Sequence, residues 1–339
     1  MSYSDFLNAI KAQDHEGIPV WFMRQAGRYM PEFSQIRNGR SIREMCKDPE
    51  TVAHITELPV RKLGVDAAII FHDILLPLEA MGLRVEYGKD GPSVRSNVMD
   101  LMARGEFFEY SKENDNYPLP ESIHKFREGN PGVPLIGFSG GPITLASYII
   151  SEKRDGDLSL VRRMIHNEPQ RFSEILRILT EMIIGFSKAQ LRAGVSVIQI
   201  FDSWAGYLSG DMFSKIYSSY LREISAELTG LAPTIYFSTG TWHVQSVLEE
   251  LGFDYLSVDW RRDILSYSNA IKESLGIQGN LDPALAASDL NVVKAEVMRI
   301  ANGMKWKNNY IFNLGHGVPQ FGSENILKEI VREVHSVTR

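Results

Sequence analysis

Two arginines, Arg24 and Arg28, stand four residues apart in the stretch WFMRQAGRYMPEF, residues 21–33. A guanidinium group keeps its charge at every physiological pH and can bind a carboxylate through two parallel hydrogen bonds. On a helix the two side chains would share a face, as an ordinary solvated pair whose stems cover apolar surface. Gly27 between them and Pro31 after them favour an irregular loop, in which both cations could converge on carboxylates. Both interpretations stay open on these residues alone.

Other polar side chains directly follow apolar runs. Asp73 in FHDIL ends such a run, where its ordinary role is to cap the helix expected for ILLPLEAMG. His316 in NLGHGV lies between two glycines, which let the backbone approach a ligand, although a plain turn would have the same neighbours. Tyr148 and Ser203 are further candidates, for which a core position and a helix cap are the alternatives.

Metal sites and nucleophile sites have recognisable spacings, and this chain lacks them. None of the eight histidines belongs to an H-x-H, H-E-x-x-H or Cys/His pair with ligand spacing, so we predict no metal. Ser203, His316 and Asp73 could supply a nucleophile, a base and an acid. No G-x-S-x-G turn is present, however, which argues against that chemistry.

Composition narrows the classes of ligand and the location. The chain has 339 residues, 44% of them hydrophobic, and can bury a sizeable core. Its net charge of -6 argues against a general binder of nucleic acid or of anionic membranes, so an acidic ligand must meet a local basic site. A single cysteine, Cys46, excludes an internal disulfide, and no apolar signal segment or membrane span is apparent. We therefore expect a cytoplasmic protein.

The elements that must position these residues recur with a regular rhythm. Short runs rich in β-branched and aromatic residues are apolar at consecutive positions, as in parallel strands covered on both faces. Helical periodicity separates several of them, most clearly over residues 169–194, 213–228 and 242–252. The eight candidate strands are 19–22, 65–71, 133–139, 195–201, 232–238, 254–260, 275–281 and 308–315.

Eight strand-then-helix units predict an α/β fold of one (β/α)8 TIM-type barrel, with a single domain over residues 1–339. A doubly wound sheet with a second small domain is the alternative, but it would favour a G-x-G-x-x-G turn that RQAGRY does not supply. The irregular segment 82–122 is interpreted as an elaborated loop after the second strand. The active site of such a barrel lies at the carboxyl ends of its strands. Asp202 and Asp259 are interpreted as residues that simply end strands.

Several blocks together carry a family resemblance. PVWFMRQAGRYMPEF, FHDIL, VPLIGFSGGPITLASYII, IQIFDSWAG, GNLDP and FNLGHGV occur in this order along the whole chain. The sequence resembles the uroporphyrinogen decarboxylase family, and RQAGRY is that family's most distinctive signature. The resemblance implies a distorted (β/α) barrel, usually a homodimer, that needs no metal or organic cofactor. It also implies that four acetate side chains of a cyclic tetrapyrrole, uroporphyrinogen III, become methyl groups, giving coproporphyrinogen III for haem synthesis.

The same resemblance assigns roles to residues. Asp73 is expected to accept hydrogen bonds from pyrrole N–H groups and to stabilise a cation formed during decarboxylation, and Arg24 to act as proton donor or electrostatic anchor. Asp73 is expected to be ionised near neutral pH unless desolvation dominates. The residues that match the family's substrate-binding positions are Arg24, Gln25, Ala26, Gly27, Arg28, Arg37, Asp73, Tyr148, Ser203 and His316.

Two alternatives stay beside this interpretation. Zinc-dependent cobamide or thiol methyltransferases share the barrel, but they use His and Cys ligands, and Cys46 lies outside the strand ends. A non-catalytic tetrapyrrole carrier would keep the arginines without needing Asp73. The segments 237–243 and 317–324 depart from the usual family pattern, which concerns the rim of the site more than its reaction.

Overall fold

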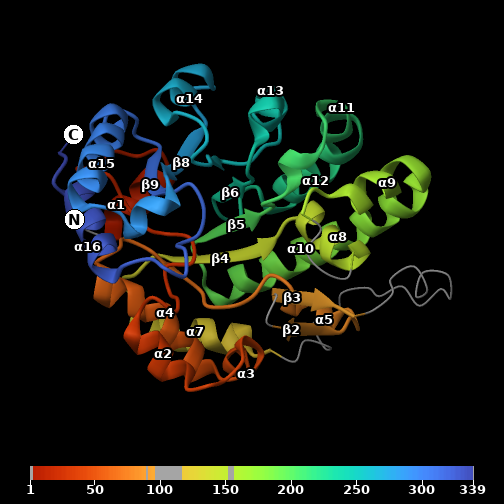
Figure 1. The fold of residues 1–339 in the computed structure, drawn as a ribbon, viewed down its shortest axis with the longest axis horizontal. Helices are drawn as coiled ribbons and strands as arrows, with labels where there is room; N and C mark the ends of the chain where they lie inside the picture. Colours follow the sequence, from red (N-terminus) through yellow and green to blue (C-terminus); the bar gives the residue numbers. More distant parts are fainter. Residues whose placement is uncertain (1–2, 89–90, 96–116, 152–155, 339) are drawn as a thin grey trace.

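The structure is a computed structural model that describes residues 3–88, 91–95, 117–151 and 156–338. Its centre is a parallel sheet of seven strands that curls around an apolar core, in the order β1-β4-β5-β6-β7-β8-β9 (Figure 1). The strands of this sheet are β1 (Ala68–Ile69), β4 (Leu135–Gly140), β5 (Val197–Phe201), β6 (Thr234–Phe237), β7 (Tyr255–Ser257), β8 (Gly276–Leu281) and β9 (Tyr310–Leu314).

Seven of the eight predicted strands are therefore present, and all neighbours pair in parallel. The first predicted strand, 19–22, forms only an isolated parallel bridge between Val20 and Phe312 of β9. On its other side the Val20 carbonyl accepts a hydrogen bond from the Asp66 N–H at 2.8 Å, just before β1. The described sheet is thus a curled half-barrel, and the prediction of eight regular strands is wrong for this segment. The backbone groups of residues 19–22 bond alternately to β9 and to Asp66, and they do not form a continuous ladder with either.

The helices lie mostly outside the curled sheet. The longest, α10 (Pro169–Ala193), has the predicted bounds almost to the residue: its apolar positions three and four apart are buried, and it ends at Gly194 with φ +112°. The other helices are α1 (Tyr3–Ile10), α2 (Pro31–Arg37), α3 (Ile42–Cys46), α4 (Pro49–Leu63), α5 (Leu76–Ala80), α7 (Leu119–Gly129), α8 (Pro142–Ser151), α9 (Ser159–Asn167), α11 (Gly210–Met212), α12 (Ser218–Leu228), α13 (Gln245–Leu248), α14 (Ile264–Ala270), α15 (Leu290–Met304) and α16 (Glu324–His335).

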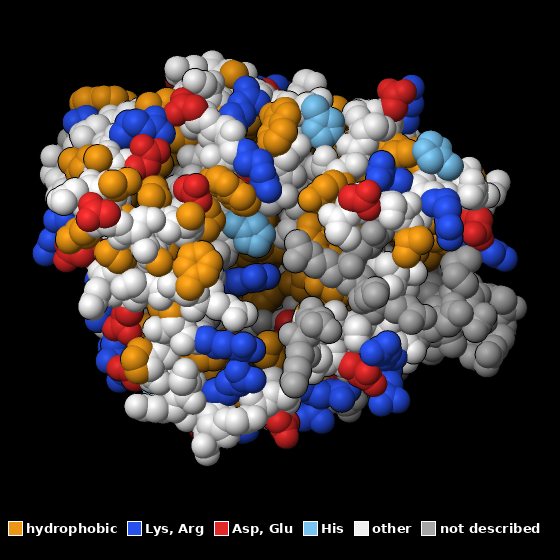
Figure 2. Space-filling view, viewed as in Figure 1, with side chains coloured by type: hydrophobic (Ala, Val, Ile, Leu, Met, Phe, Trp, Pro, Cys, Tyr) orange, Lys and Arg blue, Asp and Glu red, His pale blue; other side chains and the backbone are white. Residues whose placement is uncertain are grey.

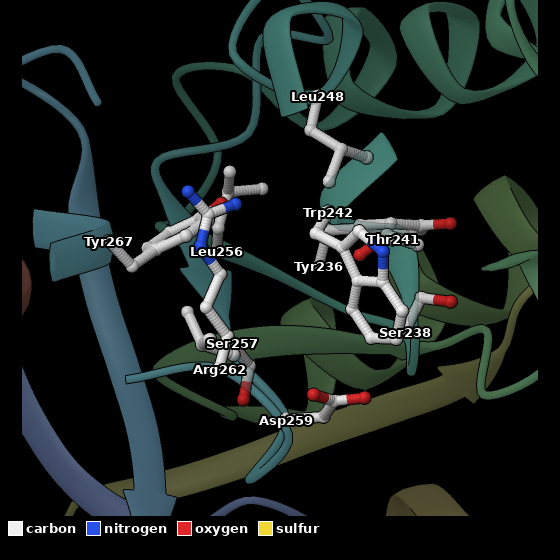
Figure 3. Close-up of a pocket in the computed structure, with 11 residues that line it drawn as sticks. Tyr236, Ser238, Thr241, Trp242, Leu248, Leu256, Ser257, Asp259, Arg262 and Tyr267 are labelled. Carbon is white, nitrogen blue, oxygen red and sulfur yellow. The ribbon is translucent and has the colours of Figure 1, made fainter. Parts of the chain in front are cut away.

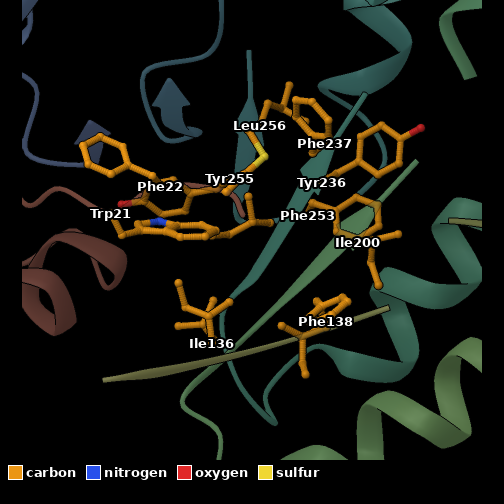
Figure 4. Packing of buried hydrophobic residues seen from close by; sticks show 14 of the residues in the cluster. Trp21, Phe22, Ile136, Phe138, Ile200, Tyr236, Phe237, Phe253, Tyr255 and Leu256 are labelled. Carbon is orange, nitrogen blue, oxygen red and sulfur yellow. The ribbon is translucent and has the colours of Figure 1, made fainter. Parts of the chain in front are cut away.

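The core combines aromatic side chains with a buried polar layer. Trp21 is fully buried, and Figure 4 shows its indole among aromatic and aliphatic side chains of the strands. Its Nε1 donates to Oε1 of Gln278 at 2.9 Å, and Gln278 in turn donates to Ser257 Oγ at 2.9 Å. This layer satisfies polar groups that would otherwise be costly to bury, and it holds the irregular segment 19–22 against the sheet.

Part of the segment predicted as a loop has regular structure. Within 82–122 the strands β2 (Val85–Gly88) and β3 (Gly91–Val94) form an antiparallel hairpin, and α7 begins at Leu119. Residues 96–116 of the predicted loop lie outside the described residues. None of the described helices is long and apolar enough to cross a membrane.

Candidate active site

The loop that carries the two arginines is joined to the loop after β9. The Val318 N–H donates to the Met23 carbonyl at 2.8 Å, and Gly317 faces the stem of Arg24 so closely that an added Cβ would lie 2.5 Å from Arg24 Cδ. A side chain at position 317 would therefore displace Arg24. His316 and Arg24, far apart in the sequence, are brought together at the carboxyl end of the sheet.

Arg24 adopts a left-handed backbone conformation, with φ +56°. Such a conformation costs a non-glycine residue about 1–3 kcal/mol and persists only where the surroundings enforce it. The surroundings are visible: Gln25 is buried, its Oε1 accepts the Phe22 N–H at 3.1 Å, and its Nε2 donates to the Ala67 carbonyl at 3.1 Å. The amide of Gln25 thus anchors the loop to the start of β1. Its predicted contact with substrate stays a prediction.

The remaining residues of this segment differ in their surroundings. Arg24 and Arg28 are exposed, and neither forms an ion pair with a described carboxylate. Ala26 and Gly27 are half-buried. Arg37 lies in the last turn of α2 and donates from Nε to the Arg40 carbonyl at 2.9 Å. Two guanidinium groups are therefore available to a ligand, and the third is partly engaged.

Asp73 follows β1 and precedes α5. Its Oδ1 accepts the Leu75 N–H at 2.9 Å, which closes a turn just before the helix. The N-cap residue of α5 is Leu75, so the helix cap that the sequence allowed for Asp73 is not formed. Burial raises the pKa of Asp73, while the Leu75 N–H, the Tyr87 phenol and the charge of Arg24 act in the opposite direction. The charge of Arg24 is the smallest of these influences on the pKa of Asp73, and the joint role of this carboxylate and this cation stays a prediction. Desolvation, which the sequence analysis left open, is the largest influence on this carboxylate.

Tyr87 and His72 flank Asp73 and were not identified from the sequence. The Tyr87 hydroxyl, on β2, acts on the pKa of Asp73 and has no partner of regular hydrogen-bond geometry among the described residues. His72 Nδ1 lies 3.1 Å from the Asp73 carbonyl, and its ring lies against Tyr117 and Phe186. Tyr87 comes from the hairpin inside the predicted loop, so no spacing in the sequence pointed to it.

His72 should make the protein sensitive to acid. Burial lowers the pKa of His72 to about 4, from an ordinary value of 6.5. The unfolded chain takes up a proton first as the pH falls, so stability is lost between pH 6.5 and pH 4, by ~3 kcal/mol in total. We expect His72→Gln to lose less stability than the parent between pH 7 and pH 5 in urea unfolding. The exposed His54→Gln is the control, and equal losses in all three proteins would contradict the assignment.

Tyr148, Ser203 and His316 come from α8 and from the segments that follow β5 and β9. Tyr148 on α8 is buried, with its ring centroid 5.1 Å from that of Trp204. Ser203 follows β5, and its carbonyl accepts the Thr239 hydroxyl at 2.7 Å. His316 Nδ1 accepts the Gly317 N–H at 2.7 Å, which leaves the proton of the neutral ring on Nε2.

Asp202, the residue before Ser203, connects several elements through hydrogen bonds. It is fully buried; Oδ1 accepts the Thr144 N–H at 2.9 Å, and Oδ2 accepts the hydroxyls of Tyr217 and, at 3.0 Å, of Tyr236. Burial raises the pKa of Asp202, and these donors oppose that shift. Asp202 therefore does more than end a strand, because it ties α8 and β6 to the end of β5.

The hollows on the molecule are not all lined by the same residues. Figure 2 shows a hollow near the centre of this face, with apolar side chains inside it and Lys or Arg side chains along its border. A separate small pocket of about 20 Å³ lies at the ends of β6 and β7 (Figure 3).

Within the described residues, no group of three or more His, Cys, Asp or Glu could hold a metal ion. The expectation of a metal-free, cofactor-free site stays a prediction.

Comparison with known proteins decides the family. The uroporphyrinogen decarboxylase family model matches residues 1–337. The uroporphyrinogen decarboxylase of Thermoplasma acidophilum is 44% identical over 333 residues, 98% of this chain and 98% of the relative. The chain belongs to the uroporphyrinogen decarboxylase family. The protein of that name from Picrophilus torridus is 42% identical over 334 residues, with 98% of this chain and 99% of the relative covered.

Solved structures agree on the fold. A methyltransferase from Methanosarcina mazei superposes with a TM-score of 0.84 at 22% identity, covering 99% of each chain. A putative vitamin-B12 independent methionine synthase from Listeria monocytogenes superposes with a TM-score of 0.59 at 12% identity, covering 95% of this chain and 96% of the other. At these identities the likeness shows the fold alone. The resemblance to the uroporphyrinogen decarboxylase family is confirmed by the relatives in sequence.

Proposed function

We propose that this protein decarboxylates the four acetate side chains of uroporphyrinogen III to methyl groups, giving coproporphyrinogen III in haem synthesis. The observation that carries the proposal is membership of the uroporphyrinogen decarboxylase family over residues 1–337, with 44% identity to a decarboxylase of that name over 98% of each chain. The charge of Arg24, which acts against the raised pKa of Asp73, adds support. Arg24 and Arg28 are exposed cations on a protein of net charge -6, and a substrate with eight carboxylates needs such a local positive site.

Decarboxylation requires a group that accepts the electron pair of the broken carbon–carbon bond. A proton added to a ring carbon of the pyrrole gives a cation; the bond between the acetate methylene and its carboxylate then breaks, and the pair flows into that ring as carbon dioxide leaves. A second proton converts the resulting exocyclic methylene into a methyl group, and the ring proton is lost. Each acetate therefore consumes one proton overall, and no oxidant or reductant is required.

In this proposal Asp73 is the counter-ion of the pyrrole cation. As a carboxylate it accepts hydrogen bonds from pyrrole N–H groups. This interaction becomes more favourable as positive charge develops on the ring. Burial raises the pKa of Asp73 and so disfavours its carboxylate, whereas the Leu75 N–H, the Tyr87 phenol and the charge of Arg24 favour the carboxylate that this proposal requires. Arg24 anchors a substrate carboxylate beside it, and Tyr148, Ser203 and His316 contact other acid groups.

Arg28 should act mainly by attraction. We expect Arg28→Gln to raise the KM for uroporphyrinogen about tenfold at low ionic strength, since a charge-assisted hydrogen bond contributes roughly 1.5–3 kcal/mol. The effect should shrink at high salt, because screening weakens exposed charges. Initial rates at two salt concentrations measure it. Arg171→Gln, on the outer helix α10, is the control, and an unchanged KM for Arg28→Gln at both salts would refute this role.

Anaerobic incubation with uroporphyrinogen tests the function itself. Chromatography of the products should show loss of four carboxylates, with the same rate in the presence of a metal chelator. Binding without turnover would favour a tetrapyrrole carrier, and loss of activity with chelator would favour a zinc enzyme of the same superfamily. Either result would overturn the proposal.

We propose further that residues 1–339 form one domain of the distorted (β/α)8 type, in which segment 19–22 stands in for the eighth strand. The hydrogen bonds from this segment to β9 on one side and to Asp66 on the other support that closure. We also propose a cytoplasmic homodimer. Light scattering should then give twice the 38.3 kDa of one chain, and a mass of one chain at micromolar concentration would contradict the dimer.

A further inference from the structure

A second basic and aromatic cluster lies beside the candidate active site, at the carboxyl ends of β6 and β7. An open hollow of about 380 Å³ is lined by Trp242, Arg261 and Arg262. Ligand clefts usually start at about 300 Å³, so the hollow can take a ring-sized group. Trp242 belongs to the segment 237–243 that departs from the usual family pattern, and none of the three residues has a role in the proposed reaction.

The two guanidinium groups of this cluster lie over aromatic rings as cation–π pairs. The Arg261 guanidinium carbon lies 4.0 Å from the ring centroid of Trp260, and that of Arg262 lies 5.0 Å from the ring centroid of Tyr267. Stacking of this kind orients the planar cation before a ligand arrives, so less conformational entropy is lost on binding. Trp242 is 51% exposed, and its indole is available to a flat partner.

Charge in the hollow is positive. Arg261 donates from one guanidinium nitrogen to Asp259 Oδ2 at 2.7 Å, and the Gly240 N–H donates to the same oxygen at 2.6 Å. Asp259 is thus already neutralised and is only 4% exposed. Arg262 forms no ion pair with a described carboxylate. A ligand that enters here meets an uncompensated cation.

The floor of the hollow contains a buried polar atom. The small pocket of about 20 Å³ shares Trp242 and Arg262 with the hollow and is also lined by Ser238, which is 4% exposed. Ser238 Oγ has no partner of regular hydrogen-bond geometry among the described residues. In Figure 3, Arg262 and Tyr267 lie on one side of this pocket and Trp242 and Ser238 on the other. The pocket has room for one small polar group such as a carboxylate oxygen.

We propose that this cluster is a second binding site for a planar polycarboxylate of the porphyrin class. Trp242 stacks on the ring, and Arg262, aided by Arg261, binds an acidic arm. Trp260 is the shared wall, because its ring contacts Arg261 on one side and lies 6.2 Å from the His316 ring on the other. The ligand class rests on the proposed function, whereas the existence of the site rests on the geometry of these residues.

Equilibrium binding of uroporphyrin I, the oxidised and planar octacarboxylate, tests the site. We expect two molecules per chain for the parent protein. Trp242→Ala and Arg262→Gln should each weaken one of the two by about tenfold or more, while the other stays unchanged. Arg28→Gln should weaken the other molecule only.

Trp306 offers a matched control at the opposite end of the sheet. It is 75% exposed, with the Lys305 ammonium 4.9 Å from its ring centroid, and it precedes β9 instead of following a strand. Trp306→Ala should leave both binding events intact. One molecule per chain in the parent, or equal weakening by Trp242→Ala and Trp306→Ala, overturns the proposal. Turnover of uroporphyrinogen, measured in parallel, shows separately whether the proposed reaction holds.

Discussion

Asp73→Asn is expected to lower the turnover of uroporphyrinogen by at least ~10²-fold, the usual loss when one preorganised electrostatic group is removed from a reaction. Asparagine keeps the shape of the side chain and can still accept the Leu75 N–H, so the turn before α5 is preserved. What is lost is the negative charge opposite the developing pyrrole cation. The KM should change little, because the interaction strengthens only in the transition state.

The matched control is Asp282→Asn. Asp282 also follows a strand of the sheet, β8, and caps the next turn by accepting the Ala284 N–H at 2.9 Å, but its side chain is exposed. We expect its turnover within about twofold of the parent, as for surface changes away from a site. Asp73→Asn with near-normal turnover would remove Asp73 from the mechanism.

The same substitution should make the folded chain more stable at neutral pH. Because burial raises the pKa of Asp73 above its ordinary value of 3.8, the folded state loses stability as the pH rises from 3.8 through the folded-state value. Asparagine has no proton to release, so the variant does not lose this stability. Relative to the parent it is more stable above the folded-state pKa of Asp73, and it has no such advantage below pH 3.8. A higher melting temperature at pH 7, but not below pH 3.8, is the expected signature of charge held in place for function.

Asp202→Ala is expected to lower the free energy of unfolding by ~3–5 kcal/mol, as when one partner of a buried polar network is removed. The Thr144 N–H and the hydroxyls of Tyr217 and Tyr236 would all lose their acceptor in a fully buried place. Urea unfolding monitored by circular dichroism measures the loss. Truncation also frees α8 to shift, so turnover should fall as well.

Asp211→Ala is the control for this substitution. Its side chain is 81% exposed and pairs only with Lys215 at 3.0 Å, so the change should be within about 0.5 kcal/mol. Asp202→Asn keeps an oxygen for the Thr144 N–H and should lie between the two. A loss for Asp202→Ala no greater than for Asp211→Ala would show that the network does not stabilise the fold.

Periodicity predicted most of the sheet, because strands covered on both faces are apolar at every position. Seven strands and the bounds of α10 follow from that pattern. The segment 19–22 was misassigned as a regular strand, since Trp21 is buried as a strand residue would be but its neighbours bond alternately to β9 and to Asp66. A buried irregular segment and a buried strand have the same apolar sequence pattern. Only the hydrogen-bond partners in the folded chain distinguish the two.

Motifs in the sequence point to candidate site residues, whereas residues that reach them only through packing have no such mark. The family blocks point to Arg24 and Asp73, whose roles stay predictions; the charge of Arg24 acts against the raised pKa of Asp73. Tyr87 reaches Asp73 from a hairpin that composition alone classed as loop. Asp202 was considered a simple strand end, since nothing in FDSW shows that two tyrosines from later elements converge on it. Contacts between elements far apart in the chain have no local signature.

The most direct test is an anaerobic crystal structure with the product, coproporphyrinogen III, bound. The account predicts pyrrole N–H groups at hydrogen-bond distance, roughly 2.7–3.2 Å, from the Asp73 carboxylate, with acid arms on Arg24 and Arg28. A macrocycle bound with its nitrogens turned away from Asp73, or held elsewhere while Asp73 faces solvent, would contradict it.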